Sequence, residues 1–236
     1  IIMKTTELYQ KLSAEIPSAL SCNWDNDGVM LLPSENHTVK KILLTLDITA
    51  HTIALAKKQN CNLMISHHPF LFRPLSRFSC EDAKARDILT LLEADIAVFS
   101  FHTRLDAATD GVNDALAQLL QLNNIVPLIC DGIPLGRIGT LTEQISFEKF
   151  LALVSKKLKA PQLSYIQETD FVRTVAVVGG DGKDYINAAK AAGADLYLTG
   201  QASYNSMLDA KGGGMSVIEA GHYYTEAPVL RLLQKR

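Results

Sequence analysis

Asn62-Leu-Met-Ile-Ser-His-His-Pro69 carries an apolar run that leads directly into two adjacent histidines and a proline. The run has the length and composition of a buried β-strand. Neighbouring side chains point to opposite faces while a strand is regular, but the backbone leaves the strand at Pro69. The rings of His67 and His68 can therefore converge beyond the edge of the sheet, where open α/β folds bind their ligands.

Two further pairs of polar residues follow predicted strands. His102 and Asp106 come after one apolar run, and His222 and Glu226 come after another. The members of each pair are four residues apart. A single histidine at a strand end is most often a hydrogen-bonded loop residue. Four of the six histidines follow predicted strands, however, and imidazole suits zinc, iron and manganese, so the pattern indicates a metal site.

Predicted strands and helices alternate along the chain. We predict helices at 7–16, 50–58, 81–94, 111–122, 147–158 and 185–192, and strands at 41–46, 62–66, 96–99, 174–178, 196–198 and 215–218. Thr6 is the expected N-cap of the first helix, and Ser146 that of the fifth. The alternation predicts an α/β fold with mixed or parallel sheets flanked by helices.

The two halves of the chain have similar patterns. Moving residues 42–68 by 133 positions superposes strand, helix and strand without a gap, and it matches Ile53 with Ile186 and Leu63 with Leu196. We therefore expect two related α/β units. The same shift places His67-His68 opposite Gly200-Gln201, so the first unit is expected to carry the ligands.

A turn-rich segment from Pro127 to Arg137 marks the expected domain boundary. Residues 1–126 plus 220–236 would form the α/β domain with the metal site, and residues 127–219 would form the second α/β domain.

Gly179-Gly-Asp-Gly182 lies between a predicted strand and a predicted helix. Glycines in this position can hold a phosphate against the amides of a helix N-terminus. Neither of the two common glycine-rich phosphate patterns is present. A tight turn between the strand and the helix is therefore the favoured interpretation.

Composition limits the class of protein. The chain has 236 residues, of which 47% are hydrophobic and 20% are charged, and its net charge is −2. These values are typical of a globular protein with one large or two small domains. No apolar run approaches the ~18 residues of a membrane-spanning helix. The lack of a dense positive cluster argues against a nucleic-acid partner.

The start of the sequence and its cysteines suggest where the protein works. Ile1 and Ile2 precede a plausible initiator, Met3, and the start lacks the apolar core of a signal peptide. The four cysteines are widely spaced and form no C-x-x-C pair, which indicates free thiols in a reducing compartment. We therefore expect a cytoplasmic protein.

Several stretches together resemble one family, the GTP cyclohydrolase I type 2 homologues, also called NIF-three-like proteins. They are Asn23-Trp-Asp-Asn-Asp-Gly28, Ile65-Ser-His-His-Pro-Phe70, His102-Thr-Arg-Leu-Asp106 with Gly111-Val-Asn-Asp114, Gly179-Gly-Asp-Gly-Lys183 and Gly221-His-Tyr-Tyr-Thr-Glu226. The resemblance runs from about residue 6 to the end of the chain. It implies the short form of the family, without the domain inserted in longer members, and assembly into a ring-like homohexamer.

The resemblance also implies a dinuclear metal centre. Its expected ligands are His67, His68, Asp106, His222 and Glu226, all of the expected type in this chain. Three imidazoles and two carboxylates suit two divalent ions of zinc, iron, manganese or cobalt. Glu226 would bridge the two ions, while the assignment of each histidine to an ion stays open.

Three other positions carry less definite expectations. His102 is a candidate outer-shell proton carrier, or else a hydrogen-bonded loop residue. Gln201 and Asn205 stand where many family members have an acidic residue and a histidine, so no substrate contact is assigned to them. Arg104 often varies to Asn among relatives and is given no fixed role.

The expected function is that of a metal-dependent hydrolase acting on a nucleotide or related heterocycle. Two divalent ions would activate a water for such a reaction. A non-catalytic metal-binding assembly or adaptor protein is one alternative, and a metal-dependent phosphoesterase with the same centre is another.

Overall fold

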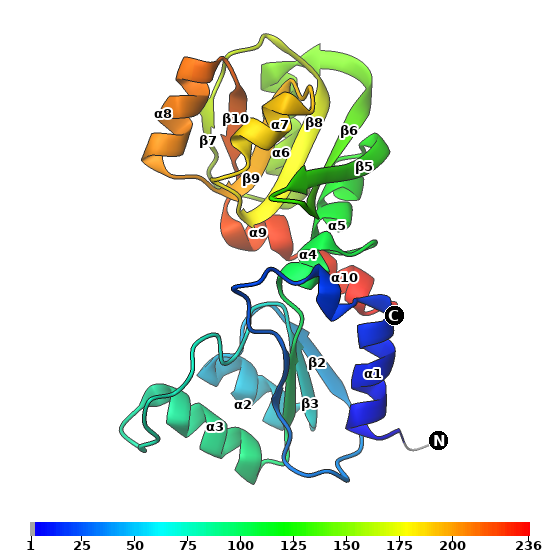
Figure 1. The fold of residues 1–236 in the computed structure, drawn as a ribbon, viewed down its shortest axis with the longest axis vertical. Helices are drawn as coiled ribbons and strands as arrows, with labels where there is room; N and C mark the ends of the chain where they lie inside the picture. The colour runs from blue at the N-terminus through cyan, green and yellow to red at the C-terminus, as the bar shows by residue number, and fades with distance from the viewer. Residues whose placement is uncertain (1–2) are drawn as a thin grey trace. The chain divides into compact units, whose positions relative to one another are not determined.

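The computed structural model describes residues 3–236, so Ile1 and Ile2 lie outside the described residues. The chain divides into two compact units: unit 1 ends at Leu105, and unit 2 comprises Asp106–Arg236. Figure 1 shows the elements of both units. The division falls inside a short helix, α4 (Thr103–Ala107).

Unit 1 is built on a four-stranded sheet with the order β1-β4-β3-β2. Its strands are β1 (Gly28–Leu31), β2 (Ile42–Thr45), β3 (Leu63–Ser66) and β4 (Ala97–Ser100). The strands β2, β3 and β4 are parallel, whereas β1 is antiparallel to β4 at the edge. Every residue of β3 and β4 is buried. Burial on both faces explains why the sequence of these strands is continuously apolar.

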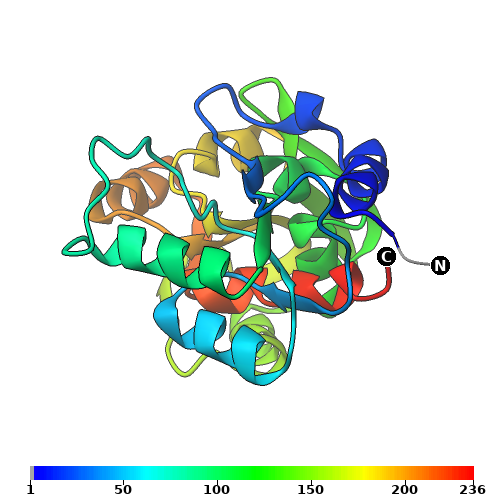
Figure 2. The same ribbon diagram turned by 90° about the horizontal axis from the view of Figure 1, so that it is seen from below.

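Helices cover both faces of this sheet. They are α1 (Thr5–Glu15), α2 (Ala50–Lys58) and α3 (Ala83–Glu93), with a short 3-10 helix, η1 (Ser18–Leu20), after α1. Ile53 of α2 and Ile88 of α3 share a buried cluster with Val98, and Figure 2 shows these two helices alongside each other. On the other face, Tyr9 of α1 packs edge-on against Phe99, with ring centroids 5.1 Å apart.

The first helix begins two residues earlier than predicted, so the assignment of Thr6 as its N-cap was wrong. The N-cap is Lys4. Thr5 is fully buried, and its hydroxyl lies 2.7 Å from Nδ1 of His37. This contact ties the first helical residue into the core, and no local sequence rule predicts it.

Unit 2 is built on a six-stranded sheet with the order β5-β6-β8-β9-β10-β7. Its strands are β5 (Asn123–Cys130), β6 (Ile133–Ser146), β7 (Ser164–Ile166), β8 (Phe171–Asp181), β9 (Leu196–Gln201) and β10 (Ser216–Glu219). Strands β8, β9 and β10 are parallel, and the remaining pairings are antiparallel.

The helices of unit 2 also lie on two faces. They are α5 (Val112–Leu119), α6 (Phe147–Leu158), α7 (Ile186–Ala191), α8 (Tyr204–Gly213), α9 (His222–Glu226) and α10 (Val229–Leu233). Val177 belongs to the core formed with α5 and α6, whereas its neighbour Val178 belongs to the core formed with α7 and α8. This alternation follows from the pleat of β8. As predicted, α6 begins after Ser146, whose hydroxyl accepts a hydrogen bond from the Lys149 amide.

The predicted relation between the two units is confirmed by their strand pairing. Ile42 pairs with Leu63 in unit 1, and Val175 pairs with Leu196 in unit 2, which reproduces the shift found in the sequence. The order β1-β4-β3-β2 corresponds to β7-β10-β9-β8, with an antiparallel strand at the same edge in both. Residues 67–68 therefore correspond in place to residues 200–201.

The segment from Pro127 to Arg137 is not a domain boundary. It forms the turn and the adjoining residues of a hairpin between β5 and β6, which turns at Asp131 and Gly132, both with positive φ. Pro127 is tolerated because β5 is an edge strand. Pro134 is tolerated because β6 pairs with β8 only from Arg137 onward.

The observed units also differ from the division expected from the sequence, which grouped residues 1–126 with 220–236. Leu116 of α5 and Ala220 share a buried core with Val175 of the second sheet. Helices α5, α9 and α10 thus belong to unit 2, which contains all residues after Leu105. Apolar periodicity identifies each helix, but it does not tell which sheet the helix covers.

The structure can be compared with two expectations from the sequence, on membrane-spanning helices and on the cysteines. Within residues 3–236, no helix is long and apolar enough to cross a membrane. All four cysteines fall in this part of the chain, and none of them forms a disulfide bond.

Candidate metal centre

Unit 1 brings three histidines together at the carboxyl edge of its sheet. His67 and His68 follow β3, and His102 follows β4. The ring centroids are 5.0 Å apart for His67–His68, 5.3 Å for His67–His102 and 5.8 Å for His68–His102. Each ring offers one nitrogen, and these three atoms lie within 4.8 Å of one another. The two rings of the His-His pair therefore converge, as the sequence predicted.

Each of these histidines has an oxygen acceptor at Nδ1. His67 Nδ1 lies 3.0 Å from the Phe101 carbonyl, and His68 Nδ1 lies 2.9 Å from Asp47 Oδ1. His102 Nδ1 lies 2.8 Å from Oδ1 of Asp25. A carbonyl or carboxylate oxygen accepts, so Nδ1 carries the proton and Nε2 is the basic nitrogen of each neutral ring. This arrangement is typical of metal-binding histidines.

Asp25 fixes the start of α4 as well as the His102 ring. Its carboxylate is fully buried and also accepts hydrogen bonds from the Thr103 amide, at 3.0 Å, and from the Thr103 hydroxyl. Burial raises the pKa of Asp25 and is the largest single influence. The hydrogen bond and charge of His102, together with the bonds from Thr103, outweigh it and lower the pKa to about 2. Asp25 is therefore ionised beside His102 at neutral pH.

Asp27, two residues further on, holds the same segment from another side. Its Oδ2 accepts from the His102 amide at 3.2 Å and from Nε of Arg104 at 3.0 Å. Arg104 is fully buried, and its guanidinium lies 4.4 Å from the centre of the Phe101 ring. Arg104 thus holds Asp27 and packs on Phe101 within unit 1. The sequence analysis gave Arg104 no role.

The two adjacent histidines differ in burial. His67 is fully buried, whereas the side chain of His68 is 24% exposed. Both residues lie past the end of β3, as the sequence indicates. The ring of His67 is nevertheless enclosed, and its Nδ1 is held by the carbonyl of Phe101, the residue that follows β4.

Unit 2 carries a second pair of ligand-type residues on α9. His222 Nε2 lies 3.0 Å from Oε1 of Glu226, and Glu226 is buried, with a side chain only 4% exposed. His222 Nδ1 lies 3.2 Å from Oε1 of Gln201 at the end of β9. A buried carboxylate requires a positive partner, and a protonated histidine or a cation beside it meets that requirement.

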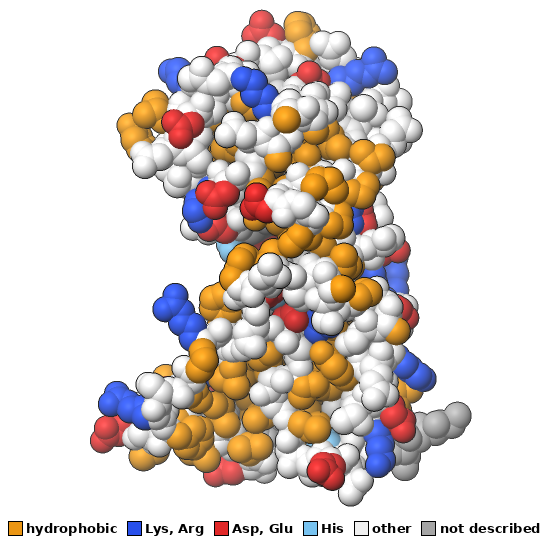
Figure 3. All heavy atoms as spheres, in the orientation of Figure 1, with side chains coloured by type: hydrophobic (Ala, Val, Ile, Leu, Met, Phe, Trp, Pro, Cys, Tyr) orange, Lys and Arg blue, Asp and Glu red, His pale blue; other side chains and the backbone are white. Residues whose placement is uncertain are grey.

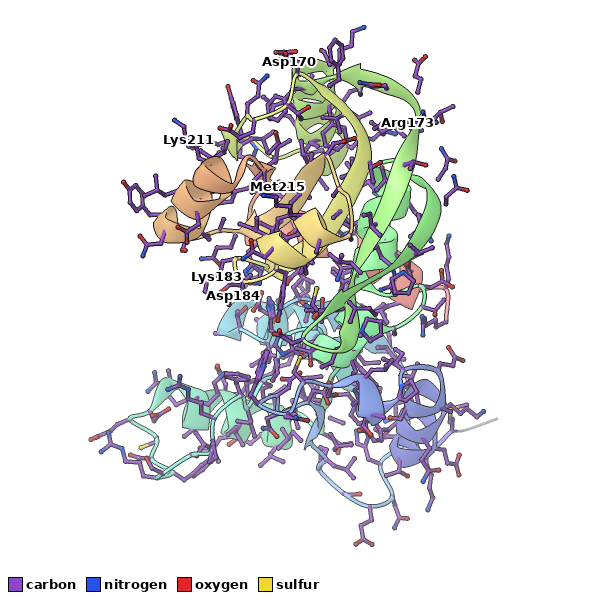
Figure 4. All side chains as sticks on the ribbon, turned by 45° about the horizontal axis from the view of Figure 1, so that its top comes forward. Asp170, Arg173, Lys183, Asp184, Lys211 and Met215 are labelled. Atoms are coloured by element: carbon purple, nitrogen blue, oxygen red, sulfur yellow. The ribbon has the colours of Figure 1, made fainter. Side chains whose placement is uncertain are left out.

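The glycines after Val178 make room for this pair. Gly180 has φ +67°, and a Cβ there would collide with Glu226 Oε1. The Gly179, Gly180 and Gly182 amides donate to side-chain oxygens of Asn113, Thr225 and Thr199 respectively. These amides are therefore engaged within the protein, against a phosphate-binding role. These glycines lie at the carboxyl end of β8, next to Lys183 and Asp184 in Figure 4, whereas Asp170 and Arg173 mark the other end of the strand.

The remaining predicted positions also belong to unit 2. Asp106 is half-buried on α4, and its carbonyl accepts from the Asn113 side chain at 3.3 Å. Asn205 is exposed on α8. Sequence reasoning missed Asp25, Asp47 and the contact of Gln201 with His222. Asp47 could have been found, since it lies two residues after β2, at the same sheet edge as the histidines.

Together, the fold and these residues define a protein of two related α/β units with ligand-type side chains at the carboxyl edge of each sheet. The model of the family Duf34/NIF3 (NGG1p interacting factor 3) matches residues 3–236, and the chain belongs to this family. The resemblance inferred from the sequence is thereby confirmed.

Named relatives and solved structures agree with this assignment. The chain is 32% identical to a GTP cyclohydrolase 1 type 2 homolog of Clostridium perfringens, over 97% of this chain and 88% of the relative. It is 34% identical to one of Methanocaldococcus jannaschii, over 95% and 90%. A hypothetical protein of Staphylococcus aureus has a similar structure, with a TM-score of 0.90 and 26% identity over 99% of this chain and 91% of the other. Reduced HcgD from Methanocaldococcus jannaschii gives a TM-score of 0.86 at 30% identity, over 100% and 93%.

Proposed function

We propose that this chain binds divalent metal through His67, His68, Asp106, His222 and Glu226. The observation that carries the proposal is the common arrangement of the histidines. The Nδ1 atoms of His67, His68 and His222 each face an oxygen acceptor, which selects Nε2 as the ligand atom. The buried carboxylate of Glu226 adds a charged donor that suits a cation.

The donor set fits two transition-metal ions. Imidazole nitrogens favour zinc, iron, manganese or cobalt over calcium, which prefers oxygen ligands. Carboxylates such as Asp106 and Glu226 neutralise part of the ionic charge, and Glu226 has the buried position expected of a bridging ligand. We therefore propose a dinuclear centre in each subunit.

We further propose that the centre serves hydrolysis of a nucleotide or related heterocycle. Bound divalent ions would supply Lewis acidity and a nucleophile at neutral pH. In unit 1, the buried Asp25 carboxylate orients His102, as a carboxylate orients a catalytic base in other enzymes. His102 would accept or donate the proton through Nε2. The substrate class follows the relatives' name, which refers to GTP.

Assembly and location complete the proposal. We propose a ring-like homohexamer, in keeping with the family resemblance. A cytoplasmic location is in keeping with the three buried cysteine thiols. Several large apolar side chains are also exposed on the single chain, and Figure 3 shows such side chains on the visible face of unit 1. Light scattering at micromolar concentration that gave a monomer would reject the assembly.

The function is tested by comparing metal content and turnover in two variants. His68→Ala should lose metal and hydrolysis together, whereas His102→Gln should keep its metal and lose hydrolysis of GTP or of a phosphoester panel. Product analysis would separate ring opening from phosphoester cleavage. A wild-type protein that is fully loaded but turns over no substrate would favour a non-catalytic metal-binding protein. Loss of metal from His102→Gln would make His102 a ligand instead.

A further inference from the structure

Two exposed aromatic side chains lie beside His102 in unit 1. Trp24 is 62% exposed and Phe72 is 42% exposed, and their ring centroids are 6.2 Å apart. The His102 ring lies 6.1 Å from Trp24 and 6.2 Å from Phe72. Large aromatic rings gain free energy when they are buried. Their exposure beside the proposed catalytic histidine therefore points to a ligand.

These side chains line a pocket of a size suited to a small molecule. The pocket has a volume of about 550 Å³ and is also lined by Asn26, Arg73 and Pro74. Binding sites for small ligands span about 300–1,000 Å³ and combine apolar walls with a few polar groups. The Trp24–Phe72 pocket has both features.

The walls of this pocket are held in place by hydrogen bonds. The Asn26 side chain donates to the Leu71 carbonyl, which joins the segment carrying Trp24 to the segment carrying Phe72. Asp25, next to Trp24, is fixed by its bonds to His102 and Thr103. The two aromatic rings are thus carried by tethered segments, which lowers the entropy cost of binding.

The angles between the rings favour a flat occupant. Trp24 and Phe72 meet at 78°, and they form a corner next to His102. A planar ring stacked on the face of one would meet the other edge-on, and both arrangements are favourable for aromatic rings. An aliphatic ligand has no ring to stack, so it would not gain the aromatic contribution that this geometry offers.

Arg73 adds a positive charge at the same pocket. Within residues 3–236 it forms no ion pair and no hydrogen bond. A guanidinium matches phosphate or carboxylate groups by its paired donors. The pocket therefore offers a stacking corner and a cation to one ligand.

We propose that the Trp24–Phe72 pocket binds the planar nitrogen heterocycle of an anionic small molecule, such as a nucleotide, and presents it to His102. This inference rests on the proposed function, because it names the part of unit 1 that would select the substrate of the metal centre.

The chain provides its own probe, because Trp24 is its only tryptophan. Zinc-loaded full-length protein would be titrated with GMP, UMP and ribose 5-phosphate while Trp24 emission is recorded. Equilibrium dialysis would measure binding independently of fluorescence. We expect saturable quenching by at least one nucleotide and none by ribose 5-phosphate. Phe72→Leu should weaken nucleotide binding about tenfold or more, as loss of a stacking partner does.

Two further variants sharpen the test. Arg73→Gln should weaken nucleotide binding but leave binding of the uncharged nucleoside unchanged. Tyr204→Leu is the matched control, since Tyr204 is an aromatic residue of unit 2 that is 80% exposed, and it should bind nucleotide like the wild type. Metal content would be measured on every sample.

The inference is overturned if neither nucleotide binds, if ribose 5-phosphate quenches equally, or if Phe72→Leu binds like the wild type. A Phe72→Leu protein with a changed oligomeric state and unchanged nucleotide binding would show that the pocket is a contact between copies. Each of these results with full metal content leaves the proposed metal centre standing. If the wild-type protein failed to bind zinc, the proposed function itself would be overturned.

Discussion

Asp25→Asn should destabilise unit 1 and lower hydrolysis while leaving the metal bound. The Asp25 carboxylate is fully buried and accepts three hydrogen bonds, one from His102 and two from Thr103. Asparagine keeps one acceptor oxygen but turns an NH₂ group toward a donor. A hydrogen bond to a charged group contributes about 1.5–3 kcal/mol, so we expect a loss of roughly 2–4 kcal/mol. Asp25 orients His102, which is not one of the five proposed ligands, so the metal content should stay that of the wild type while hydrolysis falls.

The pH dependence of this loss gives a second, independent result. In the folded protein the pKa of Asp25 is about 2, below its ordinary value of 3.8. A lowered folded pKa stabilises the protein above the ordinary value, and this stabilisation is lost as pH falls toward 2. The difference between wild type and Asp25→Asn should therefore be constant above about pH 5 and shrink in acid.

Urea unfolding of chelator-treated protein, followed by circular dichroism, measures the loss of unfolding free energy and its pH dependence without metal stabilisation. Asp95→Asn is the control, because Asp95 is 67% exposed and lies 3.9 Å from Nε2 of His37. It should change the unfolding free energy by less than about 0.5 kcal/mol. If Asp25→Asn were as stable as this control at every pH, the anchoring role of Asp25 would be refuted.

Four other substitutions test the two groups of ligand-type residues. His67→Ala should lower the stability of the metal-free protein by a few kcal/mol because His67 is fully buried, whereas His68→Ala should cost less than about 1 kcal/mol; equal losses in thermal unfolding would contradict this. Gly180→Ala should reduce both stability and metal content, since its Cβ would collide with Glu226; a protein unchanged in both would mean that α9 has room to move. Glu226→Gln should bind fewer ions than the wild type by elemental analysis, and full stoichiometry would count against bridging.

The sequence predicted the elements whose signals are local. Helix α2 has the predicted bounds Ala50–Lys58, and α6 has the predicted bounds and the predicted N-cap, Ser146. The strand before His67 was recognisable because burial on both faces makes its residues continuously apolar. The repeat was visible because both units keep the same strand register.

Features that depend on distant residues could not be predicted in this way. His102 and Asp25 are separated by 77 positions, so no spacing rule connects them. From the sequence, Pro127 indicated a turn. In the structure it lies within β5, which can contain a proline because β5 is an edge strand, and a strand's place in the sheet cannot be recognised from the local sequence. The burial of His67 likewise depends on β4, which is adjacent to β3 in the sheet and not in the chain.

Elemental analysis of protein purified without chelator tests the central claim, metal binding through the clustered histidines, most directly. The wild type and His51→Ala, which changes an exposed histidine outside both sites, should carry about two transition-metal ions per subunit. His68→Ala should lose at least one of them while remaining folded. A His68→Ala protein with the full metal content of the wild type would contradict the account.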